Sequence, residues 1–515
     1  AEAIHPGYGF LSENPDFAEA CQAAGITFIG PTADAIRKMG LKSTARRIMS
    51  AAGIQVVPGY DGRDQSLEVL RRNAETIGLP VLIKASAGGG GKGMRVIREA
   101  GELEDAIEAA RREAEKSFGD GTLLLEKYID RARHIEVQIL GDNHGNLIHL
   151  FERECSIQRR YQKIIEESPS PAMSSELRRR ICEAAVAAGR AIGYTNAGTI
   201  EFILAPSGEF YFIEVNTRLQ VEHPVTEMIT GVDLVKLQIE IACDKPLSLG
   251  QAEIKQNGHA IEARLYAENP CNGFLPATGT LREWDPPSIE GLRIDPGVAP
   301  GAEVGIHYDP ILAKLIAHAS DRESARRRLA FGLANLFAAG VQTNREFLIK
   351  AIEHSEFASG NYHTGFVDQN LDELITQTNE CEDLIAASVV ALFISRRLQA
   401  EAATLPNLPP CYRNNRFRDP SIKLQVGGAS VDISWRPIGN ESFSMSSGDW
   451  QANLELVSFE RDRIRASIDG IQRMFRISEA GDQFFVQANF LSSVVRRLPR
   501  YPHAQAATIT PASSI

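Results

Sequence analysis

The pattern of apolar and polar positions near the start of the chain alternates between helix and strand signals. Apolar residues recur at helical spacing over 14–25, 31–40 and 66–78, with glycine or proline at the segment ends. Short apolar runs at 26–30 and 80–85 read as strands between them. Helices and strands that alternate in this way predict an α/β architecture.

Two long hairpins are predicted in the middle of the chain. The first runs over 133–158 and turns at 141–146, where the residues are Gly-Asp-Asn-His-Gly-Asn. The second runs over 198–216 and turns at 205–208, which are Ala-Pro-Ser-Gly. Helical spacing follows the two hairpins, at 174–192 and 232–243.

The pattern changes in the last half of the chain. Strands with Gly and Pro turns occupy about 258–318, helices dominate 321–356, and an Ala- and Leu-rich helix runs near 382–402. A Pro-rich stretch, 404–415, reads as a linker. Short alternating strands then fill 421–498, which predicts a small antiparallel barrel or sandwich. The predicted fold class is an α/β core followed by a small helix-plus-antiparallel β-barrel domain.

Composition is that of an ordinary globular protein, with 43% hydrophobic and 23% charged residues among 515. Length alone suggests about three or four domains. A net charge of −11 argues against nucleic acid as a partner, and no apolar run reaches the roughly 20 residues that cross a membrane. The seven cysteines are scattered. They fit a reducing compartment, which is the cytoplasm or, in a eukaryote, the mitochondrial matrix.

A glycine-rich loop beside Lys84 is the clearest local signal for phosphate binding. A dinucleotide fingerprint needs a helix after the glycines, but a β-branched strand follows here. A Walker A loop also fails, because Ser86 and Gly93 stand where Gly and Ser or Thr are required. A strand–glycine–strand hairpin can instead close over a nucleotide with its N–H groups on phosphate oxygens. A disordered hairpin tip is the alternative.

Acidic side chains converge on the second hairpin. Its turn brings Glu201 roughly opposite Glu214, with Asn216 nearby. Two carboxylates and an amide oxygen in an apolar hairpin repel one another unless a hard cation such as Mg²⁺ binds them. An exposed acidic face is the alternative. An unbroken extended strand would place one set of side chains on one face: Phe210, Phe212, Glu214, Asn216, Arg218, Gln220 and Glu222.

Two further polar sets lie close by in the sequence. Arg218, Gln220 and Glu222 form the first, because an arginine beside a carboxylate can bind a small oxyanion and offer it a base. A structural ion pair explains the same residues equally well. The second set is the basic stretch 158–163, which by itself reads as a solvated basic face.

Five segments together resemble the biotin carboxylase family of ATP-grasp enzymes. They occur in family order and read HPGYGFLSEN, KASAGGGGKGM, ECSIQRRYQK, FIEVNTRLQVEHPVTEM and HAIEARLYAEN. The resemblance runs from residue 1 to about 370. The remainder resembles the α subunit of acyl-CoA carboxylases of the propionyl-, methylcrotonyl- or acetyl-CoA type, in which a helix-plus-barrel domain contacts the carboxyltransferase β subunit.

The resemblance implies a ligase in which ATP phosphorylates bicarbonate and the resulting carboxyphosphate carboxylates biotin. Glu222 would be the base that deprotonates bicarbonate, and Arg293 would stabilise the biotin enolate. The implied ATP contacts are Lys42, Lys84, Gly88, Gly89, Gly90, Gly91, Gly93, Glu126, Lys127, Ile129, His134 and Gln158. The implied bicarbonate contacts are Lys163, Arg218, Gln220 and Val221. The implied ligands for Mg²⁺ or Mn²⁺ are Glu201, Glu214 and Asn216.

The resemblance also implies a chain cut at both ends, with poor solubility when expressed alone. Biotin would be carried on a biotinyl domain that the chain lacks, so the chain itself would not become biotinylated. The expected partners are bicarbonate, a biotinyl carrier domain and the β subunit in an oligomeric assembly. The expected domains are 1–40 (end of the N-terminal α/β domain), 41–245 (ATP-grasp), 246–375 (biotin carboxylase C-terminal), 376–500 (helix plus barrel) and 501–515 (linker).

Two residues depart from the family pattern, and two other functions share much of it. Leu41 stands where the family usually has Asp, and Tyr161 where it usually has His, which leaves nucleotide affinity open. The biotin carboxylase part of pyruvate or urea carboxylase is one alternative. A non-catalytic assembly subunit is the other, although the retained lysines, acids and Arg293 argue against it.

Overall fold

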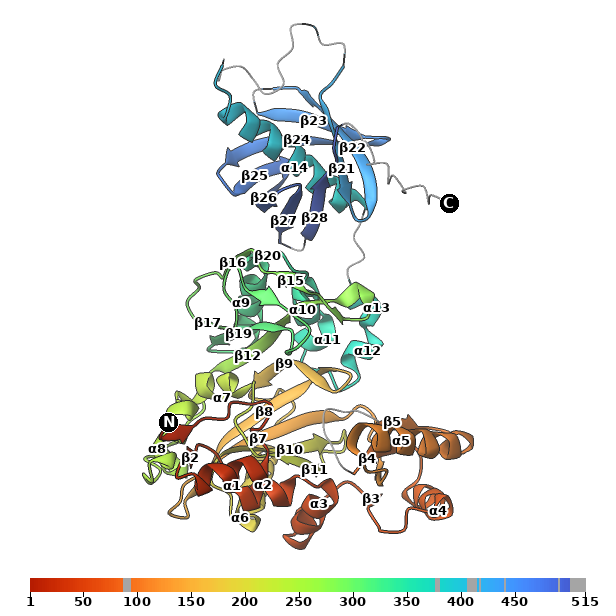
Figure 1. The fold of residues 1–515 in the computed structure, drawn as a ribbon, viewed down its shortest axis with the longest axis vertical. Coiled ribbons are helices and arrows are strands. Elements are labelled where there is room, and N and C mark those ends of the chain that lie inside the picture. The colour runs from red at the N-terminus through yellow and green to blue at the C-terminus, as the bar shows by residue number, and fades with distance from the viewer. Residues whose placement is uncertain are drawn as a thin grey trace, which may run out of the picture.

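The computed structural model describes residues 1–86, 94–375, 380–404, 415, 418–439, 441–489 and 491–500. Along the longest axis of the molecule, which is vertical in Figure 1, helices and small sheets lie at one end, a large sheet follows, and a β-barrel lies at the other end. The chain follows this order, so the barrel is built from the last part of the sequence.

An eight-stranded sheet with the order β11-β10-β7-β8-β9-β12-β19-β17 forms the middle of the molecule. All of its neighbouring strands are antiparallel, and both predicted hairpins lie in it. The β9–β12 pairing joins the strands formed by residues 133–216 to the strands that follow residue 258. Its strands are β7 (Arg133–Gly141), β8 (Leu147–Arg159), β9 (Gln162–Ser168), β10 (Asn196–Leu204), β11 (Phe210–Asn216), β12 (His259–Tyr266), β17 (Leu292–Pro296) and β19 (Ile311–Ala319).

Smaller sheets and helices are formed by residues 3–127. A parallel pair, β1 (Ala3–Ile4) and β2 (Thr27–Phe28), packs near helix α1 (Pro15–Ala23), which Asn14 caps through its side chain. A four-stranded sheet has the order β3-β6-β4-β5, and an apolar core joins it to two helices. These elements are β3 (Gly59–Tyr60), β4 (Val81–Ala85), β5 (Arg95–Ile97), β6 (Leu123–Lys127), α4 (Leu67–Ile77) and α5 (Leu103–Phe118).

The sequence pattern located most of these elements but misjudged one. Helix α2 (Ala33–Met39) begins after Thr32, which caps it, and α3 (Lys42–Ala51) follows directly. Residues 117–129 predict a strand from the sequence alone, but the strand begins only at Leu123, because the residues before it complete α5 and a short connection. Strand β6 then pairs with β4, the strand that carries Lys84.

Helices cover both faces of the large sheet. Helix α6 (Ser175–Ala191) packs on β7 and β8, and α9 (Arg322–Asn335) packs on β12 and β19. Helix α7 (His223–Thr230) lies over β8, β9, β12 and β19, where it closes the polar region described below. The remaining helices of this part are α8 (Leu234–Ala242), α10 (Arg345–Glu353), α11 (Ser355–Ala358), α12 (Phe366–Gln369) and α13 (Leu371–Leu374).

The last part of the chain is a closed barrel of strands β21 to β28 around helix α14 (Glu380–Ala400) (Figure 1). Every residue of α14 from 383 to 395 is buried, so all sides of the helix are covered. Inward-facing strand residues share one apolar core with the helix. The strands are β21 (Ser421–Val426), β22 (Ala429–Pro437), β23 (Ser442–Ser447), β24 (Trp450–Phe459), β25 (Arg463–Ile468), β26 (Ile471–Ala480), β27 (Gln483–Ala488) and β28 (Leu491–Arg497).

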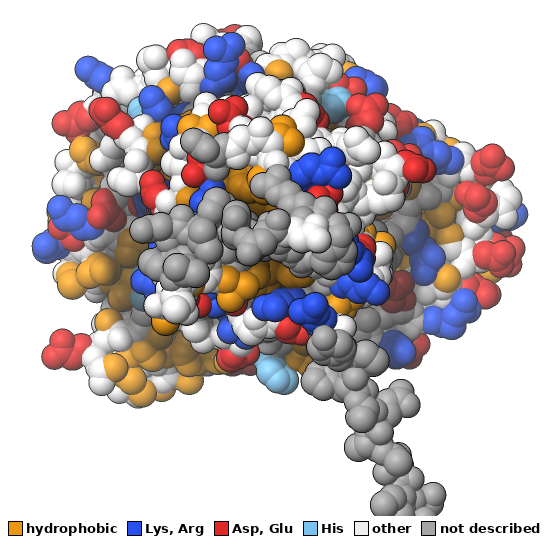
Figure 2. Space-filling model, turned by 90° about the horizontal axis from the view of Figure 1, so that it is seen from above, with side chains coloured by type: hydrophobic (Ala, Val, Ile, Leu, Met, Phe, Trp, Pro, Cys, Tyr) orange, Lys and Arg blue, Asp and Glu red, His pale blue; other side chains and the backbone are white. Residues whose placement is uncertain are grey.

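The predicted fold class is confirmed: an α/β core precedes a helix-plus-antiparallel barrel, and the sandwich alternative is wrong. The domain boundaries remain predictions. Seen from the barrel end, cationic and anionic side chains are interspersed (Figure 2). Among the described residues, no helix combines the length and the apolar character needed to cross a membrane.

Candidate functional site

The acidic hairpin has the predicted pairing but not the predicted strand face. Glu201 on β10 lies directly opposite Glu214 on β11, as predicted. The register then shifts, so Phe202 pairs with Phe212 and one residue of β11 bulges out. Phe212 therefore lies in the apolar core, on the face opposite to Glu214. The single face predicted for residues 210–222 is wrong for this reason, and also because β11 ends at Asn216.

The hairpin acids fit a hard divalent cation. Burial and the charge of Glu201 raise the pKa of Glu214, whereas Lys163 and His134 overcome burial and hold the pKa of Glu201 well below its usual range. Lys42 Nζ lies 3.9 Å from Glu214. Two carboxylates on neighbouring strands, with cations already close, form the oxygen-rich environment that Mg²⁺ or Mn²⁺ prefers. Asn216 donates its amide to Glu201 at 2.8 Å, which fixes that carboxylate.

Lys163 is the cation at the centre of the site. Its Nζ lies 2.8 Å from Glu201 and 2.7 Å from Glu222, and it also binds Glu136. Burial alone would lower the pKa of Lys163, but these three carboxylates raise it well above its usual range. The ammonium group is therefore permanently charged. The solvated basic face predicted for 158–163 is wrong at this residue, since Lys163 points into the protein.

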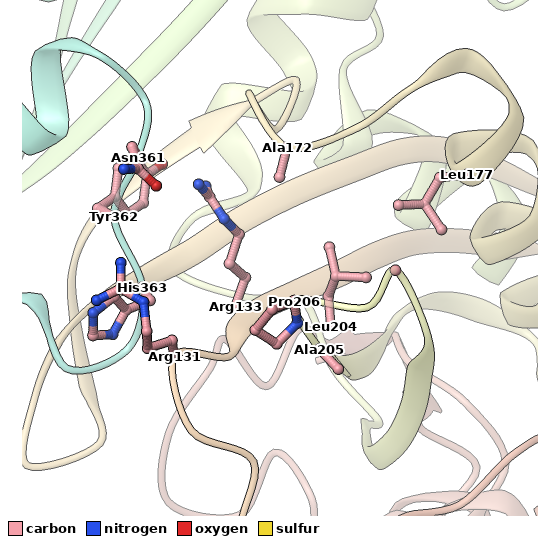
Figure 3. A pocket seen from close by; sticks show the side chains of 11 residues that line it. Arg131, Arg133, Ala172, Leu177, Leu204, Ala205, Pro206, Asn361, Tyr362 and His363 are labelled. Carbon is pink, nitrogen blue, oxygen red and sulfur yellow. The ribbon is translucent and has the colours of Figure 1, made fainter.

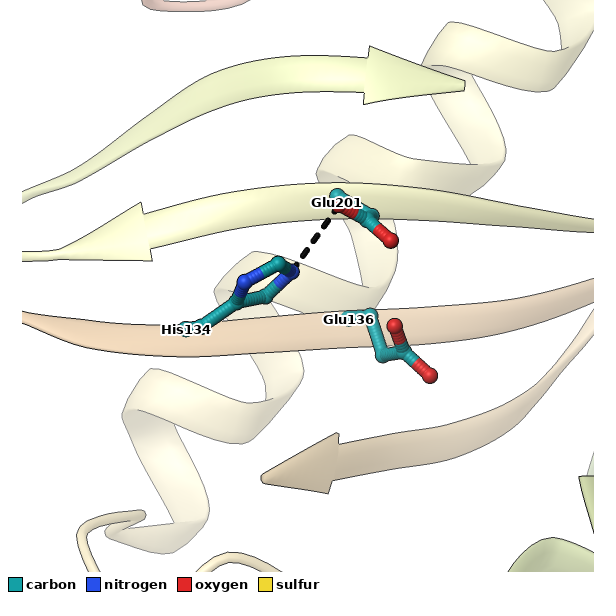
Figure 4. Close-up of side chains that lie close together, drawn as sticks. All are labelled: His134, Glu136 and Glu201. Atoms are coloured by element: carbon teal, nitrogen blue, oxygen red, sulfur yellow. Dashed lines mark ion pairs between the residues drawn. The ribbon is translucent and has the colours of Figure 1, made fainter. Parts of the chain in front are cut away.

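A histidine completes the acidic group. His134 Nε2 lies 2.9 Å from Glu201, and Figure 4 shows both side chains beside Glu136 on adjacent strands. Gln158 donates to His134 Nδ1 at 2.7 Å when that nitrogen accepts. Burial opposes a charge on the imidazole, but Glu201 raises the pKa of His134. His134, an implied nucleotide contact, therefore contacts the predicted metal ligand Glu201, and Gln158, another implied contact, lies against His134.

Arg153 is fully buried and organises the floor of the site. It donates to Glu136 on the opposite strand and to Gln138 at 2.8 Å. It also donates to Gln220 at 3.0 Å, which fixes one of the residues implied in bicarbonate binding. Two threonines complete its partners, Thr199 and Thr226. Burying an arginine is costly unless its donors are satisfied, so this network is firmly set.

Arg264 faces the predicted base. Arg264 lies on β12, and its Nη2 atom is 2.9 Å from Oε2 of Glu222. Glu222 immediately precedes helix α7. Burial would raise the pKa of Glu222, but Lys163, Arg264 and Arg153 lower it strongly. The carboxylate is therefore ionised and able to accept a proton. Arg264 lies in the segment HAIEARLYAEN, but the sequence alone indicated no role for this residue.

The lysines implied in ATP binding lie at the other side of the site. Lys84 forms an ion pair with Glu126, which Arg46 also contacts at 2.6 Å. Lys84, near the end of an apolar strand, therefore has a carboxylate partner within the protein. Lys127 donates to the carbonyl groups of Gly78 and Leu79, both at 2.8 Å. The side chains of Glu126 and Lys127 are therefore engaged within the protein.

Two predicted arginines lie away from Lys163. Arg218 donates to Glu13 at 3.1 Å and to Asn216 at 3.3 Å, and it makes no ion pair with Glu222 among the described residues. The structural ion pair that was the alternative for Arg218 and Glu222 is therefore not found, because Lys163 and Arg264 pair with the Glu222 carboxylate instead. Arg293 forms ion pairs with Glu227 and Asp295.

Other predicted residues have simpler outcomes. Val221 accepts a hydrogen bond from Lys314 Nζ at 2.8 Å through its carbonyl. Leu41 and Tyr161, the two departures, are both exposed, at 50% and 47%. The predicted lid glycines lie outside the described residues: Gly88, Gly89, Gly90, Gly91 and Gly93.

A cavity of about 240 Å³ lies on the other face of the same strands (Figure 3). Arg133 on β7 and Leu204 on β10 line this cavity and are paired across the two strands. The neighbouring pair is His134 and Ile203, one position further along. Successive strand residues point to opposite faces, so this cavity is separated from the acidic group by the sheet. It is therefore not the place where the reacting groups would meet.

The arrangement can carry out chemistry on anions. Lysine and arginine side chains alternate with carboxylates, and a low-dielectric interior strengthens each charge. One carboxylate, Glu222, is ionised beside Lys163 and Arg264, and Glu201 contacts the same lysine. Glu136, Arg153 and Arg264 were missed from the sequence. Their alternation with apolar residues along β7, β8 and β12 was the signal available.

Three family models match consecutive parts of the chain. They describe the N-terminal domain of biotin carboxylase over residues 1–36, the ATP-binding domain of the carbamoyl-phosphate synthase L chain over 42–249, and the C-terminal domain of biotin carboxylase over 262–369.

Curated relatives are similar over most of the chain. The mitochondrial α subunit of methylcrotonoyl-CoA carboxylase from Rattus norvegicus is 52% identical over 407 residues, which are 79% of this chain and 57% of that protein. Biotin carboxylase 1 of Bacillus subtilis is 49% identical over 71% of this chain and 82% of its own length. The chain thus spans little more than half the length of the first of these relatives.

A solved structure has the same fold. The biotin carboxylase domain of 2-oxoglutarate carboxylase from Hydrogenobacter thermophilus, in complex with MgADP, ADP and bicarbonate, is 47% identical. The match has a TM-score of 0.71 and covers 73% of this chain and 83% of that chain.

Proposed function

Because the chain belongs to the biotin carboxylase family, we propose that it is a ligase that carboxylates biotin with bicarbonate and ATP. The observation that carries the proposal is the ionised Glu222, held between Lys163 at 2.7 Å and Arg264 at 2.9 Å. This carboxylate can take the proton of bicarbonate while Lys163 and Arg264 bind the oxygens of bicarbonate. The remaining bicarbonate contacts would be Gln220, the backbone of Val221 and Arg218.

Deprotonated bicarbonate is the nucleophile that attacks the γ-phosphorus of ATP, which forms carboxyphosphate and ADP. Negative charge develops on the transferred phosphoryl oxygens, and fixed cations are the main way in which proteins stabilise it. Lys42 and Lys84 would hold the phosphates, and His134 and Gln158 would bound the nucleotide. A divalent cation on Glu201 and Glu214 would neutralise phosphate charge when bound. The glycine loop after Lys84 would close over the phosphates as a lid.

The carboxyl group then passes to N1′ of biotin, and an arginine would stabilise the enolate form of the biotin ring. Arg293 was assigned this role from the sequence. Arg264 is a second candidate, because it contacts the proposed base whereas Arg293 pairs with Glu227 and Asp295. Activity measurements on variants of Arg264 and Arg293 can separate a role in ATP hydrolysis from a role in the biotin step.

The wider assembly is also part of the proposal. The relatives support an α subunit of an acyl-CoA carboxylase, of which the methylcrotonoyl-CoA enzyme is one type. Biotin would come on a carrier domain, and the barrel around α14 would contact the carboxyltransferase β subunit. The compartment would be the cytoplasm or, in a eukaryote, the mitochondrial matrix.

Bicarbonate-dependent ATP hydrolysis and carboxylation of free biotin test the proposal directly. We expect ATP hydrolysis that requires bicarbonate and Mg²⁺ or Mn²⁺, and carboxybiotin formation when free biotin is added. Glu222→Gln should lose both activities by about 10²-fold or more, because the general base is removed. The matched control is Glu183→Gln, because Glu183 is an exposed glutamate on α6 that pairs with exposed Arg179. ATP hydrolysis that is independent of bicarbonate in the wild-type chain would contradict the proposal.

A further inference from the structure

Two buried carboxyl groups face each other next to the proposed base. Glu166 on β9 lies directly opposite Glu262 on β12, and opposed residues of antiparallel strands project from the same face. Both residues are fully buried. Arg264 is two positions beyond Glu262 on β12 and therefore shares this face. The strands thus bring two acids and one arginine together beneath α7.

One guanidinium group connects this pair to the proposed base. Arg264 Nη2 lies 2.6 Å from Glu166 Oε1 and 2.9 Å from Glu222 Oε2. Two carboxylates therefore share the charge of one arginine. Any change in the charge of Glu166 must alter how strongly Arg264 stabilises ionised Glu222.

Glu262 is the member of the pair that carries a proton. Among the described residues, Glu166 forms an ion pair with Arg264, whereas neither carboxyl oxygen of Glu262 has a hydrogen-bond or ion-pair partner. Burial raises the pKa of Glu262 well above its usual range; Lys314 opposes this effect and Glu166 adds to it. Two ionised carboxylates that face each other in a low-dielectric interior repel strongly, so one of them stays neutral.

Glu166 is close to the balance between its two charge states. Burial raises its pKa to about 7, Arg264 opposes the rise and Glu222 adds to it. Lys163, on the same strand, is the remaining charged group that acts on it from nearby. Glu166 therefore gains its charge as the pH rises through neutrality, while Glu262 remains neutral.

We propose that Glu166 is a positioning residue that acts on Glu222 through Arg264, with neutral Glu262 as its partner. When Glu166 is ionised, its negative charge offsets that of Arg264 at Glu222, and Glu222 is the stronger base. When Glu166 is neutral, Arg264 stabilises ionised Glu222 fully and weakens it as a base. This inference rests on the proposed function, because that function makes Glu222 the base.

The test compares the wild-type chain with Glu166→Gln in bicarbonate-dependent ATP hydrolysis from pH 6 to pH 8.5. The ratio of the two rates removes the titration of bicarbonate and nucleotide, since both proteins receive the same substrates. We expect nearly equal rates at pH 6 and a wild-type advantage of about fivefold at pH 8, in kcat rather than in the KM for ATP. A ratio that stays constant across this range overturns the proposal.

Glu262→Gln is the matched control, because it replaces a neutral acid by a neutral amide of similar shape. Its rate should stay within about twofold of the wild-type rate at every pH. A ratio that changes with pH would show that Glu262 is ionised and would overturn the assignment. Glu166→Asp retains the charge and should restore the pH-dependent step, which a purely structural role for Glu166 would not predict. Thermal unfolding of each variant checks that it folds.

A separate measurement distinguishes failure of this inference from failure of the proposed function. Absence of bicarbonate-dependent ATP hydrolysis in the wild-type chain would contradict the function alone. Infrared spectroscopy at pH 8.5, where Glu166 is ionised, would still test the carboxyl pair, because a buried protonated carboxyl has its own C=O stretch. That band should disappear in Glu262→Gln, and an unchanged spectrum overturns the pair.

Discussion

At the scale of single residues, the site depends on buried charges that neutralise one another. Lys163 contacts three carboxylates, and Arg153 and Arg264 balance the same acids from neighbouring strands. Removing one member leaves an uncompensated charge in a low-dielectric interior, which is strongly destabilising. Substitutions here therefore change both activity and stability, and the choice of residue for each test must separate the two.

The two candidate arginines differ in what they touch, and this difference is testable. Arg264→Ala should lower bicarbonate-dependent ATP hydrolysis by about 10²-fold, because one of the two cations proposed to bind the bicarbonate oxygens is lost. Arg293→Ala should retain more ATP hydrolysis than biotin carboxylation, since Arg293 lies on Glu227 and Asp295 instead. Both activities are measured for both variants. Equal losses of the two activities in Arg293→Ala would remove its assignment to the biotin step.

Residue chemistry could be read from the sequence where it sits in a recognisable motif. Glu201, Glu214 and Lys84 were placed correctly, because a hairpin turn and a strand end fix their neighbours. Arg153 and Glu136 were not found, since the alternation of charged and apolar residues along a strand does not show whether the charged face is buried. The single strand face drawn through Arg218 was wrong because the end of β11 at Asn216 had no marker in the pattern.

At the scale of elements, β9 connects the two halves of the large sheet and carries a second ion cluster on its far face. Glu167 accepts from Arg322 on α9 at 2.7 Å and contacts His259 on β12 and Tyr362. Burial would raise the pKa of Glu167, but His259 and Arg322 lower it to about 2. The cluster thus ties two strands and a helix together while Glu167 is ionised.

Glu167→Gln should destabilise the protein in a pH-dependent way. A carboxyl whose pKa falls from 4.5 to about 2 on folding contributes about 3 kcal/mol above pH 5. That contribution falls as the pH drops below 4.5, to roughly 2 kcal/mol at pH 3.5. The difference in unfolding free energy between wild type and variant, from urea titrations at pH 7 and pH 3.5, should shrink accordingly. A difference that grows as the pH falls would contradict the assignment.

Elements with strong punctuation were predicted well. Helices α1, α2 and α6 begin at the polar caps Asn14, Thr32 and Ser174, which the sequence displays openly. The bulge in β11 was not predicted, because one extra residue in a strand leaves the apolar pattern almost unchanged.

At the scale of the whole molecule, the barrel is attached to the core by buried polar contacts as well as by the chain. Arg345 on α10 is almost fully buried and donates to the carbonyls of Ala488 and Leu491 and to Ser492. Arg476 of the barrel forms an ion pair with Asp285 of the core. The barrel therefore has a defined place on the core rather than hanging from a linker.

A deletion that separates the barrel must remove its central helix as well. Deleting 376–515 should leave carboxylation of free biotin nearly intact and abolish co-purification with the β subunit. Deleting only 403–515 should give insoluble protein, because α14 then loses the strands that cover its apolar residues. Soluble yield, ATP hydrolysis and co-purification are measured for both. Loss of ATP hydrolysis in the soluble 376–515 deletion would show that the barrel belongs to the catalytic unit.

The enclosed helix α14 also constrains the order in which this protein can be made. A closed barrel offers no opening through which a helix could enter afterwards, so β28 can complete the ring only once α14 is in place. Synthesis from the N-terminus supplies the helix first, and the ring closes when β28 pairs with β21, far away in sequence. Pairings between distant residues form slowly. During that interval a helix whose residues 383–395 are buried in the finished barrel is without its cover, which makes the unfinished chain a natural substrate for chaperones.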